Sequence, residues 1–584
     1  MKNMIVSDII AKFLEDNKID TVFGIIGSAN SYIFDSIAKR GYTKIVYVHH
    51  EQTAVMSAGA YFRASGKMSM ALVTAGPGAV NSITGVVSNW ADSIPTIILS
   101  GQESTFYIKD HSNLRMLGTQ GFDASKMVKD VTKYSTTVMD GNEILYELEK
   151  SLHKAQSGRP GPVWLDIPFD VQSSPVNEYN LNIFEPKEIE YRDKYLDTVV
   201  ELINNSKRPV ILGGHGIRLS DTKDSFNQLI KKLKIPTLST WSGIDLVEEN
   251  NPYYFGRPGL YGQRRANFVI QNCDLLIVLG SRLALPQTGY NISNFAPDAR
   301  IVMVNNDKNE LKKHDRYDLT FHQDCKYFVE ELLNYDEIDS YKKKWINQCN
   351  LYKENFPTVE NHHKEDDVEY RNSYVFMDEL SNHLKSNHVI ISGMGTPMVS
   401  SHQALRLKEN QIMFTSNGLG EMGWGLPGAI GASFAQPDRE LICLMSDGSM
   451  MMNLQELQTI INYKLPMKIV IFNNDGYLFI KHTQKMLFKG NYVGVNNDTG
   501  IGLPNYEKLS KAFGYQYKKN TECTIEEFLN LDGSAIYEIF MNPEQPLTPK
   551  VKGVLTKDGI LAPPIEEMSP LLDLDTMKNN MIIG

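Results

Sequence analysis

The sequence predicts an α/β protein with three doubly wound parallel sheets, and three observations carry that prediction. Short β-branched runs alternate with longer amphipathic stretches along the chain, which is the pattern of βαβ units. The length of 584 residues suits three or four domains of about 150 residues each. The composition is 42% hydrophobic, 22% charged and 10% aromatic, an ordinary globular mixture that excludes wholesale disorder.

The first block of this pattern runs to about residue 180. It opens with an amphipathic helix, because Asp8 and Glu15 interrupt the apolar residues and no signal-peptide core is present. A polar stretch over residues 177–190 is expected to be a linker. The candidate strands of the block are residues 21–23, 44–48, 68–73, 96–99 and 163–168.

The second block opens with a strand that enters a glycine turn at Gly213 and Gly214, and it ends near residue 335. The charged segment 353–369 contains His362 and His363, and a second linker is favoured there over a metal site. The third block runs from a strand at 389–391 to about residue 545 and resembles the first in size and pattern. Prolines at 546, 549, 563, 564 and 570 predict that the remaining tail is an extended arm or lid.

Charge and cysteine content exclude several classes of protein. Lys and Arg number 59 against 69 for Asp and Glu, a net charge of −10. We therefore expect no nucleic-acid partner and no membrane association, and the longest apolar runs, such as 275–279, are too short to span a bilayer. Five scattered cysteines without a CxxC motif indicate free thiols. We expect a soluble cytoplasmic protein.

The strongest chemical signal is Asp447-Gly448-Ser449, which follows the apolar run 441–445, together with Asn474 at the end of the next strand. Carboxyl ends of neighbouring parallel strands meet at one edge of a sheet, where ligands bind. A carboxylate, an amide oxygen and a backbone carbonyl suit Mg²⁺, and a helix start offers N–H groups to phosphate. Each segment alone is explained by a simple turn; together they predict a Mg²⁺–diphosphate site.

Two weaker signals accompany the first. Four glycines around Met422 permit a flat ligand to approach the backbone closely, with a tight turn as the alternative. Glu51 follows the strand 44–48 and would begin a helix, where the plain interpretation is a carboxylate favoured by the helix dipole. A carboxyl buried against an apolar ligand would instead have a raised pKa, and it could protonate a ring nitrogen.

Six motifs occur in order over nearly the whole chain: HEQTAVMSAGAYFRASGK, TAGPGAVNSITG, DSIPTIILSGQ, GRPGPVWLDIP, GLGEMGWGLPGAIGA, and SDGSMMMNLQEL with NND. Together they resemble the thiamine-diphosphate (ThDP) enzymes of the acetolactate synthase superfamily. The resemblance implies decarboxylation of pyruvate or a similar 2-keto acid, followed by transfer of the two-carbon unit to a ketone or aldehyde. It also implies a pyrimidine-binding domain (1–180), a central domain (191–340), a diphosphate- and Mg²⁺-binding domain (370–545) and a C-terminal arm (546–584).

Residue roles follow from the matching motifs. Glu51 resembles the glutamate that contacts N1′ of the aminopyrimidine and promotes loss of the C2 proton. Met422 resembles the residue that holds the cofactor bent, with the backbone of Gly420 beside it. Asp447, Asn474 and the Gly476 carbonyl resemble the Mg²⁺ ligands. Further implied cofactor contacts are Gly76, Asn81, Gly448, Ser449 and Tyr477, and further implied catalytic residues are Ser28, Asp123 and His482.

Departures from the family pattern concern the acceptor. Ile26 replaces a proline, Asp123 a glutamine, Phe169 a lysine and Thr483 a tryptophan. An added carboxylate and a lost cation disfavour an anionic keto acid nearby, so a neutral, hydroxylated or cyclic ketone is expected as acceptor. The GYLFIKHTQ segment and the tail resemble a sub-branch that includes carboligases of keto-sugar nucleotides and a cyclohexanedione-cleaving hydrolase.

Several alternatives stay open. They are acetolactate synthase proper, a ThDP-dependent 2-keto acid decarboxylase and a cyclic dione C–C hydrolase; a non-catalytic ThDP-binding scaffold is disfavoured by the intact Glu51, Asp447 and Asn474. A homodimer or homotetramer is expected, because in the family one cofactor bridges two chains.

The resemblance leaves the binding of FAD open, because the family's RFDD motif is replaced by Arg282-Leu283-Ala284-Leu285. The positions that match the family's flavin site are Arg159, Gly213, Gly214, Thr240, Gly262 and Arg282.

Overall fold

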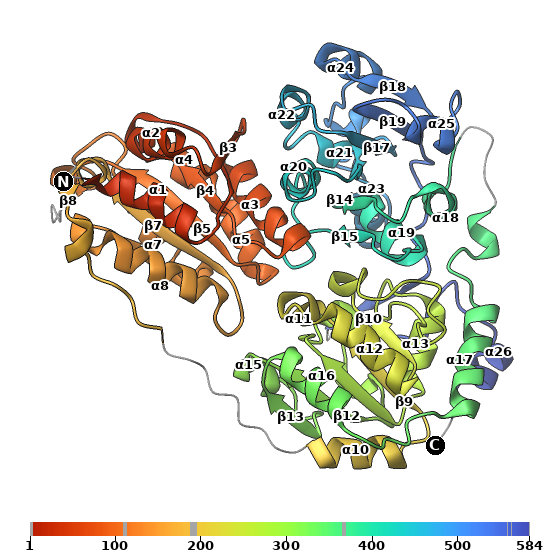
Figure 1. Cartoon of the computed structure of the whole chain (residues 1–584). Helices are drawn as coiled ribbons and strands as arrows, with labels where there is room; N and C mark the ends of the chain where they lie inside the picture. The colour runs from red at the N-terminus through yellow and green to blue at the C-terminus, as the bar shows by residue number, and fades with distance from the viewer. Residues whose placement is uncertain are drawn as a thin grey trace.

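The computed structural model describes residues 4–108, 114–186, 196–364, 370–557, 559–561 and 563–582. It contains three sheets of five or six parallel strands, each flanked by helices (Figure 1), which confirms the predicted α/β class. Parts of the two expected linkers, at 187–190 and 365–369, lie outside the described residues. We call the three sheets with their helices the first, central and third units.

The first unit has the strand order β3-β2-β4-β5-β7-β6. All of its neighbouring strands are parallel, and β2, β4, β5 and β7 are buried along their length, as expected for a sheet covered on both faces. The helix expected at the N-terminus is α1 (Val6–Asp16). The strands are β2 (Thr21–Gly24), β3 (Lys44–Tyr47), β4 (Met70–Val73), β5 (Thr96–Gln102), β6 (Tyr134–Thr137) and β7 (Pro162–Pro168), and the main helices are α2 (Ser31–Arg40), α3 (Glu51–Ser65), α5 (Ile83–Ala91) and α8 (Ile144–Gln156).

The third unit repeats this topology. Its order is β15-β14-β16-β17-β19-β18, which is the order of the first unit when the strands are counted from the start of each unit. The similarity expected between the two blocks is therefore confirmed. In both sheets the order reverses beside the first strand, and ligands bind at such switch points. The strands are β14 (Val389–Ser392), β15 (Ile412–Phe414), β16 (Leu441–Ser446), β17 (Met467–Asn473), β18 (Gln516–Lys519) and β19 (Ala535–Phe540), with helices α18 (Ser373–His383), α19 (Thr396–Ala404), α20 (Gly425–Ala435), α22 (Glu456–Asn462), α23 (Leu478–Phe488), α24 (Tyr506–Phe513) and α25 (Ile525–Leu529).

The central unit has five parallel strands in the order β10-β9-β11-β12-β13. The prediction of a linker at 353–369 is wrong for residues 353–355, because helix α17 continues to Asn355. The buried residues Trp345, Cys349 and Tyr352 give that helix an apolar face despite its charged surface. The elements are β9 (Pro209–Gly213), β10 (Thr237–Ser239), β11 (Leu275–Leu279), β12 (Arg300–Asn305), β13 (Leu319–His322), α10 (Leu196–Asn205), α11 (His215–Leu219), α12 (Lys223–Leu233), α13 (Arg264–Gln271), α16 (Cys325–Asn334) and α17 (Lys343–Asn355).

The C-terminal segment, residues 541–582, returns to the central unit. Its strands β20 (Lys550–Val551) and β23 (Met568–Ser569) pair with each other, β21 (Val554–Thr556) pairs with β22 (Gly559–Leu561), and α26 (Leu574–Asn580) follows. Asn272 on the central unit donates from Nδ2 to the Asn580 carbonyl at 2.9 Å. The histidine pair also faces this segment, since the His363 ring bonds the Thr548 carbonyl at 2.9 Å. The tail is thus built onto the central unit.

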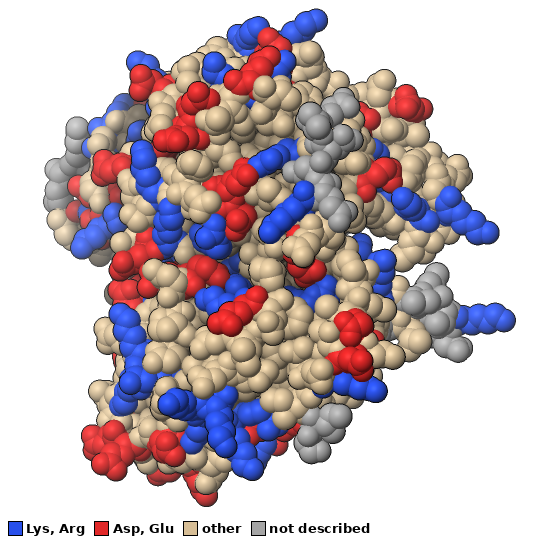
Figure 2. Space-filling view, turned by 90° about the vertical axis from the view of Figure 1, so that its right-hand side faces the viewer, with Lys and Arg blue, Asp and Glu red and all other residues tan. Residues whose placement is uncertain are grey.

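Surface and thiol properties agree with an ordinary globular protein. Acidic and basic side chains are intermixed on the face that Figure 2 draws. Across the described ranges, every helix is too short or too polar to cross a bilayer. All five cysteines are free, as the sequence predicts.

Helices α3 and α20 join the first unit to the third and lie side by side in Figure 1. One hydrophobic cluster includes residues of both helices, among them Val55 and Ile430. Ser57 donates from Oγ to the Pro427 carbonyl at 2.8 Å. The backbones approach so closely at Gly431 that a Cβ there would lie 2.1 Å from the Ser57 carbonyl oxygen. The contact between the units therefore requires glycine at this position.

We expect Gly431→Ala to lower the free energy of unfolding by about 1–3 kcal/mol, because the added methyl forces the two helices apart. Alanine is intrinsically the better helix former, so a loss identifies the packing as its cause. Chemical denaturation would measure the change. Gly502→Ala is the matched control, since a Cβ at Gly502 meets nothing closer than 3.9 Å. An unchanged or increased stability of Gly431→Ala would contradict the packing argument.

Candidate active site

A buried carboxylate organises the carboxyl edge of the third sheet. Asp447 follows β16 and is fully buried. Its Oδ1 accepts the N–H of Gly448 at 2.8 Å, and its Oδ2 accepts the N–H groups of Asn474 at 3.0 Å and Gly476 at 2.9 Å. Burial raises the pKa of Asp447 to about 7, although these backbone donors favour the charged form. The predicted metal-site residues are thus brought together.

The side chain of Asn474 completes a donor set suited to a hard cation. Its Nδ2 donates to Thr396 Oγ1 at 3.1 Å, while its Oδ1 is buried and has no partner among the described residues. Gly476 has φ 122°, and a Cβ there would lie 1.9 Å from the Val495 carbonyl oxygen, so only glycine fits. A buried carboxylate beside an unpaired amide oxygen fits Mg²⁺. Thr396 was not predicted from the sequence. Gly393 and Gly395, which follow β14 and precede Thr396, are the signal that could have identified this strand end as part of the site.

The glycine loop predicted to hold the pyrimidine lies against this edge. Gly423 donates its N–H to Ser449 Oγ at 2.8 Å, and Asn453 Nδ2 donates to the Gly423 carbonyl at 3.0 Å. Gly420 has φ 75°, and Met422 is half-buried. Tyr477 packs on Gly448, where a Cβ would lie 2.2 Å from its ring. The loop and the diphosphate edge therefore form one site.

Glu51 stands at the corresponding edge of the first sheet, as the first residue of α3. Asn81 donates from Nδ2 to Glu51 Oε2 at 3.1 Å. A Cβ at Gly78 would lie 3.1 Å from Glu51 Oε1, so the backbone approaches the carboxylate closely. Gly76 begins α4 (Pro77–Asn81) with φ 62°. The structure thus unites Glu51 with Asn81 and places Gly76 at the start of the same short helix.

The remaining predicted catalytic residues are more dispersed. Ser28 is exposed at the start of a short 3₁₀ turn (Ser28–Asn30) after β2. Asp123 caps α7 (Ala124–Met127), accepting the Lys126 N–H at 3.0 Å and pairing with the Lys126 ammonium at 2.7 Å. Its carboxylate is therefore already engaged locally. Phe169 packs on the ring of Tyr32, with ring centroids 5.0 Å apart.

His482 lies on α23 and faces the C-terminal segment. Burial, followed by the charge of Lys550, lowers the pKa of His482 to about 4, so the imidazole is neutral near pH 7. The next residue, Thr483, is exposed and donates from Oγ1 to the Phe479 carbonyl at 3.0 Å. Asp123, Phe169 and Thr483, the residues expected at the acceptor, therefore contact different neighbours.

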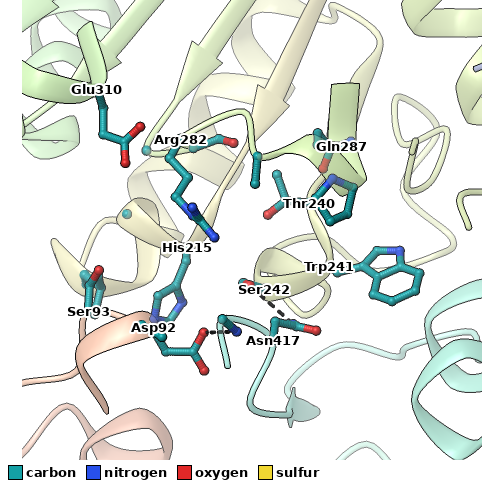
Figure 3. A pocket seen from close by; sticks show the side chains of 18 of the residues that line it. Asp92, Ser93, His215, Thr240, Trp241, Ser242, Arg282, Gln287, Glu310 and Asn417 are labelled. Carbon is teal, nitrogen blue, oxygen red and sulfur yellow. Dashed lines mark hydrogen bonds between the residues drawn. The ribbon is translucent and has the colours of Figure 1, made fainter. Parts of the chain in front are cut away.

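A cavity of about 570 Å³ lies where the three units meet. Figure 3 shows its wall, with Asp92 and Ser93 from the first unit, His215 and Arg282 from the central unit, and Asn417 from the third. Gly420 also lines it, so the cavity reaches the pyrimidine loop. Of the positions matched to the family's flavin site, Arg159, Thr240 and Arg282 line the cavity, whereas Asp92, His215 and Asn417 were not predicted.

The charges of the cavity wall are partly neutralised. Arg159 is paired with Asp307 at 3.2 Å and with Glu310 at 3.0 Å. Arg282 points toward the cavity in Figure 3 and, among the residues described, has no ion pair or hydrogen bond from its guanidinium. Burial lowers the pKa of His215 to about 3, so that ring is neutral. The cavity thus offers one uncommitted cation to an anionic ligand group.

Comparison with protein families defines the class. The chain matches the thiamine pyrophosphate enzyme N-terminal TPP binding domain at residues 4–127, the central domain at 196–332 and the C-terminal TPP binding domain at 393–539. It belongs to the thiamine pyrophosphate enzymes, and it is a ThDP-dependent enzyme of the lyase or transferase type.

The most similar curated relatives include acetolactate synthase large subunits. The chain is 28% identical over 576 residues to a probable acetolactate synthase large subunit of Methanococcus aeolicus, covering 93% of each chain. It is 29% identical over 541 residues to the acetolactate synthase isozyme 2 large subunit of Escherichia coli, covering 91% of this chain and 95% of that one. The similarity to the acetolactate synthase superfamily is therefore confirmed.

We expect Asp447→Asn to weaken Mg²⁺-dependent ThDP binding at least 100-fold, because a neutral amide replaces the carboxylate that would ligate the cation. Titration of the apo protein with ThDP at fixed Mg²⁺ would measure it. Asp475→Asn is the matched control, since Asp475 is exposed and its φ of 56° suits asparagine. Equal dissociation constants for Asp447→Asn and the control would place the metal elsewhere.

Proposed function

We propose that this enzyme uses ThDP and Mg²⁺ to decarboxylate pyruvate or a similar 2-keto acid and to join the two-carbon unit to a ketone or aldehyde. The observation that carries the proposal is the buried Asp447 carboxylate beside the unpaired Oδ1 of Asn474, next to the loop of Gly420 and Met422. This arrangement suits a cation bound to a diphosphate, with a flat ring on the loop.

In this proposal each residue has a physical task. Asp447, Asn474 Oδ1 and the Gly476 carbonyl would hold the cation, while Met422 would support the cofactor. ThDP, when bound, would supply the electron sink that decarboxylation needs. Glu51 would hold a proton at the ring nitrogen of the pyrimidine, and the hydrogen bond from Asn81 at 3.1 Å orients its carboxylate.

We further propose a homodimer or homotetramer, with domains at 1–180, 191–340 and 370–545 and an arm at 546–584. Among the described residues, the Glu51 side chain is hydrogen-bonded within the first unit and that of Asp447 within the third. A second chain would bring a first-unit edge to a third-unit edge. Such an interface buries on the order of 2,000 Å² or more.

Two candidate functions differ in the molecule that accepts the two-carbon unit. The names of the relatives favour a second pyruvate, as in acetolactate synthase. The apolar contact of Phe169 with Tyr32 and the exposed Thr483, at positions where the family has lysine and tryptophan, favour a bulkier and neutral carbonyl group, such as that of a keto-sugar nucleotide. We propose the second acceptor class.

We also propose FAD as the occupant of the cavity between the units. The cavity extends from Arg159 and Arg282 to Gly420, which suits an extended cofactor with a diphosphate, and the Arg282 guanidinium has no ion pair among the described residues. Glu310 and Asp324 also line the cavity, so the anionic part would lie at the Arg282 side.

We expect Glu51→Gln to slow CO₂ release from pyruvate by roughly 10²–10⁴-fold, because an amide cannot exchange a proton with the pyrimidine. ThDP binding should change little, which calorimetry would show. Glu178→Gln changes an exposed glutamate of the same unit and serves as control. Activity of Glu51→Gln within threefold of wild type, or ThDP-independent CO₂ release, would refute the assignment.

Product analysis decides the acceptor. With pyruvate alone, we expect acetolactate formation well below ~10 s⁻¹, a typical median turnover, and faster coupling to a hydroxylated or cyclic ketone. The triple variant Asp123→Gln, Phe169→Lys, Thr483→Trp should raise acetolactate relative to the native product. Acetolactate formation by wild type at more than ~10 s⁻¹ would instead establish acetolactate synthase.

A further inference from the structure

The C-terminal segment places a half-buried lysine next to Tyr261, a residue of the cavity wall. Strand β20 begins with Lys550, whose Nζ lies 5.6 Å from the centroid of the Tyr261 ring. The position is fixed by the backbone, because Val551 donates its N–H to the Leu260 carbonyl at 2.8 Å. Leu260 and Tyr261 both line the cavity. The ammonium therefore lies beside the cavity wall, on an element that carries none of the residues in the proposed cofactor site.

The Lys550 ammonium lacks an anionic partner. Across the part of the chain that the structure describes, no carboxylate lies within ion-pair distance of Lys550 and its ammonium donates no hydrogen bond. Glu544 is occupied by Lys485 at 3.3 Å and by the Tyr492 hydroxyl at 3.2 Å. Burial lowers the pKa of Lys550, and nearby Lys552 lowers it further. A partly desolvated cation in this state gains more from an anion than one in water.

Three ring side chains lie near this ammonium. The Tyr261 and Phe479 rings lie 6.3 Å apart, and both line the cavity. His482, one turn after Phe479 on α23, is close enough for Lys550 to lower its pKa, and it remains neutral. Two aromatic rings, a neutral imidazole and the Lys550 ammonium therefore lie close together at the start of α23.

We propose that Lys550 binds an anionic group, a carboxylate or a phosphate ester, of the acceptor. This inference rests on the proposed carboligase function, which it extends by giving the acceptor a charged end. Helix α23 begins directly after Gly476 and Tyr477 and carries Phe479 and His482 beside Lys550, so a molecule with its carbonyl near the cofactor can extend along the start of this helix to the ammonium. The acceptor then combines a neutral reacting carbonyl with an anion at its far end, held by a charge-assisted hydrogen bond.

Ligand-observed NMR titration of the full-length protein with ThDP and Mg²⁺ bound tests the proposal. The probes are D-glucose, D-gluconate and D-glucose 1-phosphate, which share a polyol and differ in charge. We expect wild type to bind at least one anionic probe tenfold more tightly than glucose. Lys550→Met should lose that preference at least tenfold, and Lys550→Arg should retain it within threefold. The probe that wild type prefers identifies the anion as carboxylate or phosphate.

Lys552→Met is the matched control, because Lys552 is exposed two residues along the chain and should leave probe binding unchanged. If Lys550→Met does not fold, wild type provides the test. Raising NaCl from about 0.05 to 0.5 M should weaken the binding of the anionic probe but not the binding of glucose. Equal binding of all probes to wild type, or an undiminished preference in Lys550→Met, would overturn the proposal. CO₂ release from pyruvate, measured on the same preparations, tests the carboligase function separately.

Discussion

The carboxylate of Asp447 is the constraint on which the site depends. It holds the chain at the ends of β16 and β17 together by accepting three backbone N–H groups. The same hydrogen bonds orient the Asn474 backbone, so that Oδ1 is left unpaired beside the carboxylate. A buried carboxylate is stable in its charged form only with donors or a cation nearby. In the proposed function, folding of this edge and binding of the cation are therefore coupled.

Parallel strand pairing explains how residues distant in sequence form one edge. Each strand of the third unit ends beside its neighbour, so Thr396, Asp447 and Asn474 meet although three separate strands carry them. The first unit uses the same strand order to bring Glu51 to Asn81. One topology, used twice, provides the edge of Glu51 and the edge of Asp447, to which the proposed function assigns proton transfer and cation binding.

This regularity also explains which features the sequence could predict. The strands, the α/β class and the contacts of Asp447, Gly420 and Glu51 follow local rules: apolar runs mark buried strands, and polar groups after them share an edge. The end of helix α17 was missed because its last turn is charged, with Lys353 and Glu354 directly after the buried Tyr352. The local bonding of Asp123 was missed because a motif match does not show that Lys126 sits three residues later as its partner.

The resemblance identified Arg159, Thr240 and Arg282 in the cavity wall, but the rest of the wall and the position of Lys550 could not be predicted from the sequence for a different reason. Asp92, His215 and Asn417 belong to three units, and Lys550 meets Tyr261 only because the tail packs back on the central unit. No periodicity along the chain encodes such long-range contacts. The sequence shows the loss of a lysine at the position of Phe169 and indicates a neutral acceptor. The fold brings to Tyr261, from another element, an ammonium that has no carboxylate partner among the described residues. A requirement for a neutral group at the reacting carbonyl is therefore compatible with the proposed requirement for an anion at the far end of the same molecule.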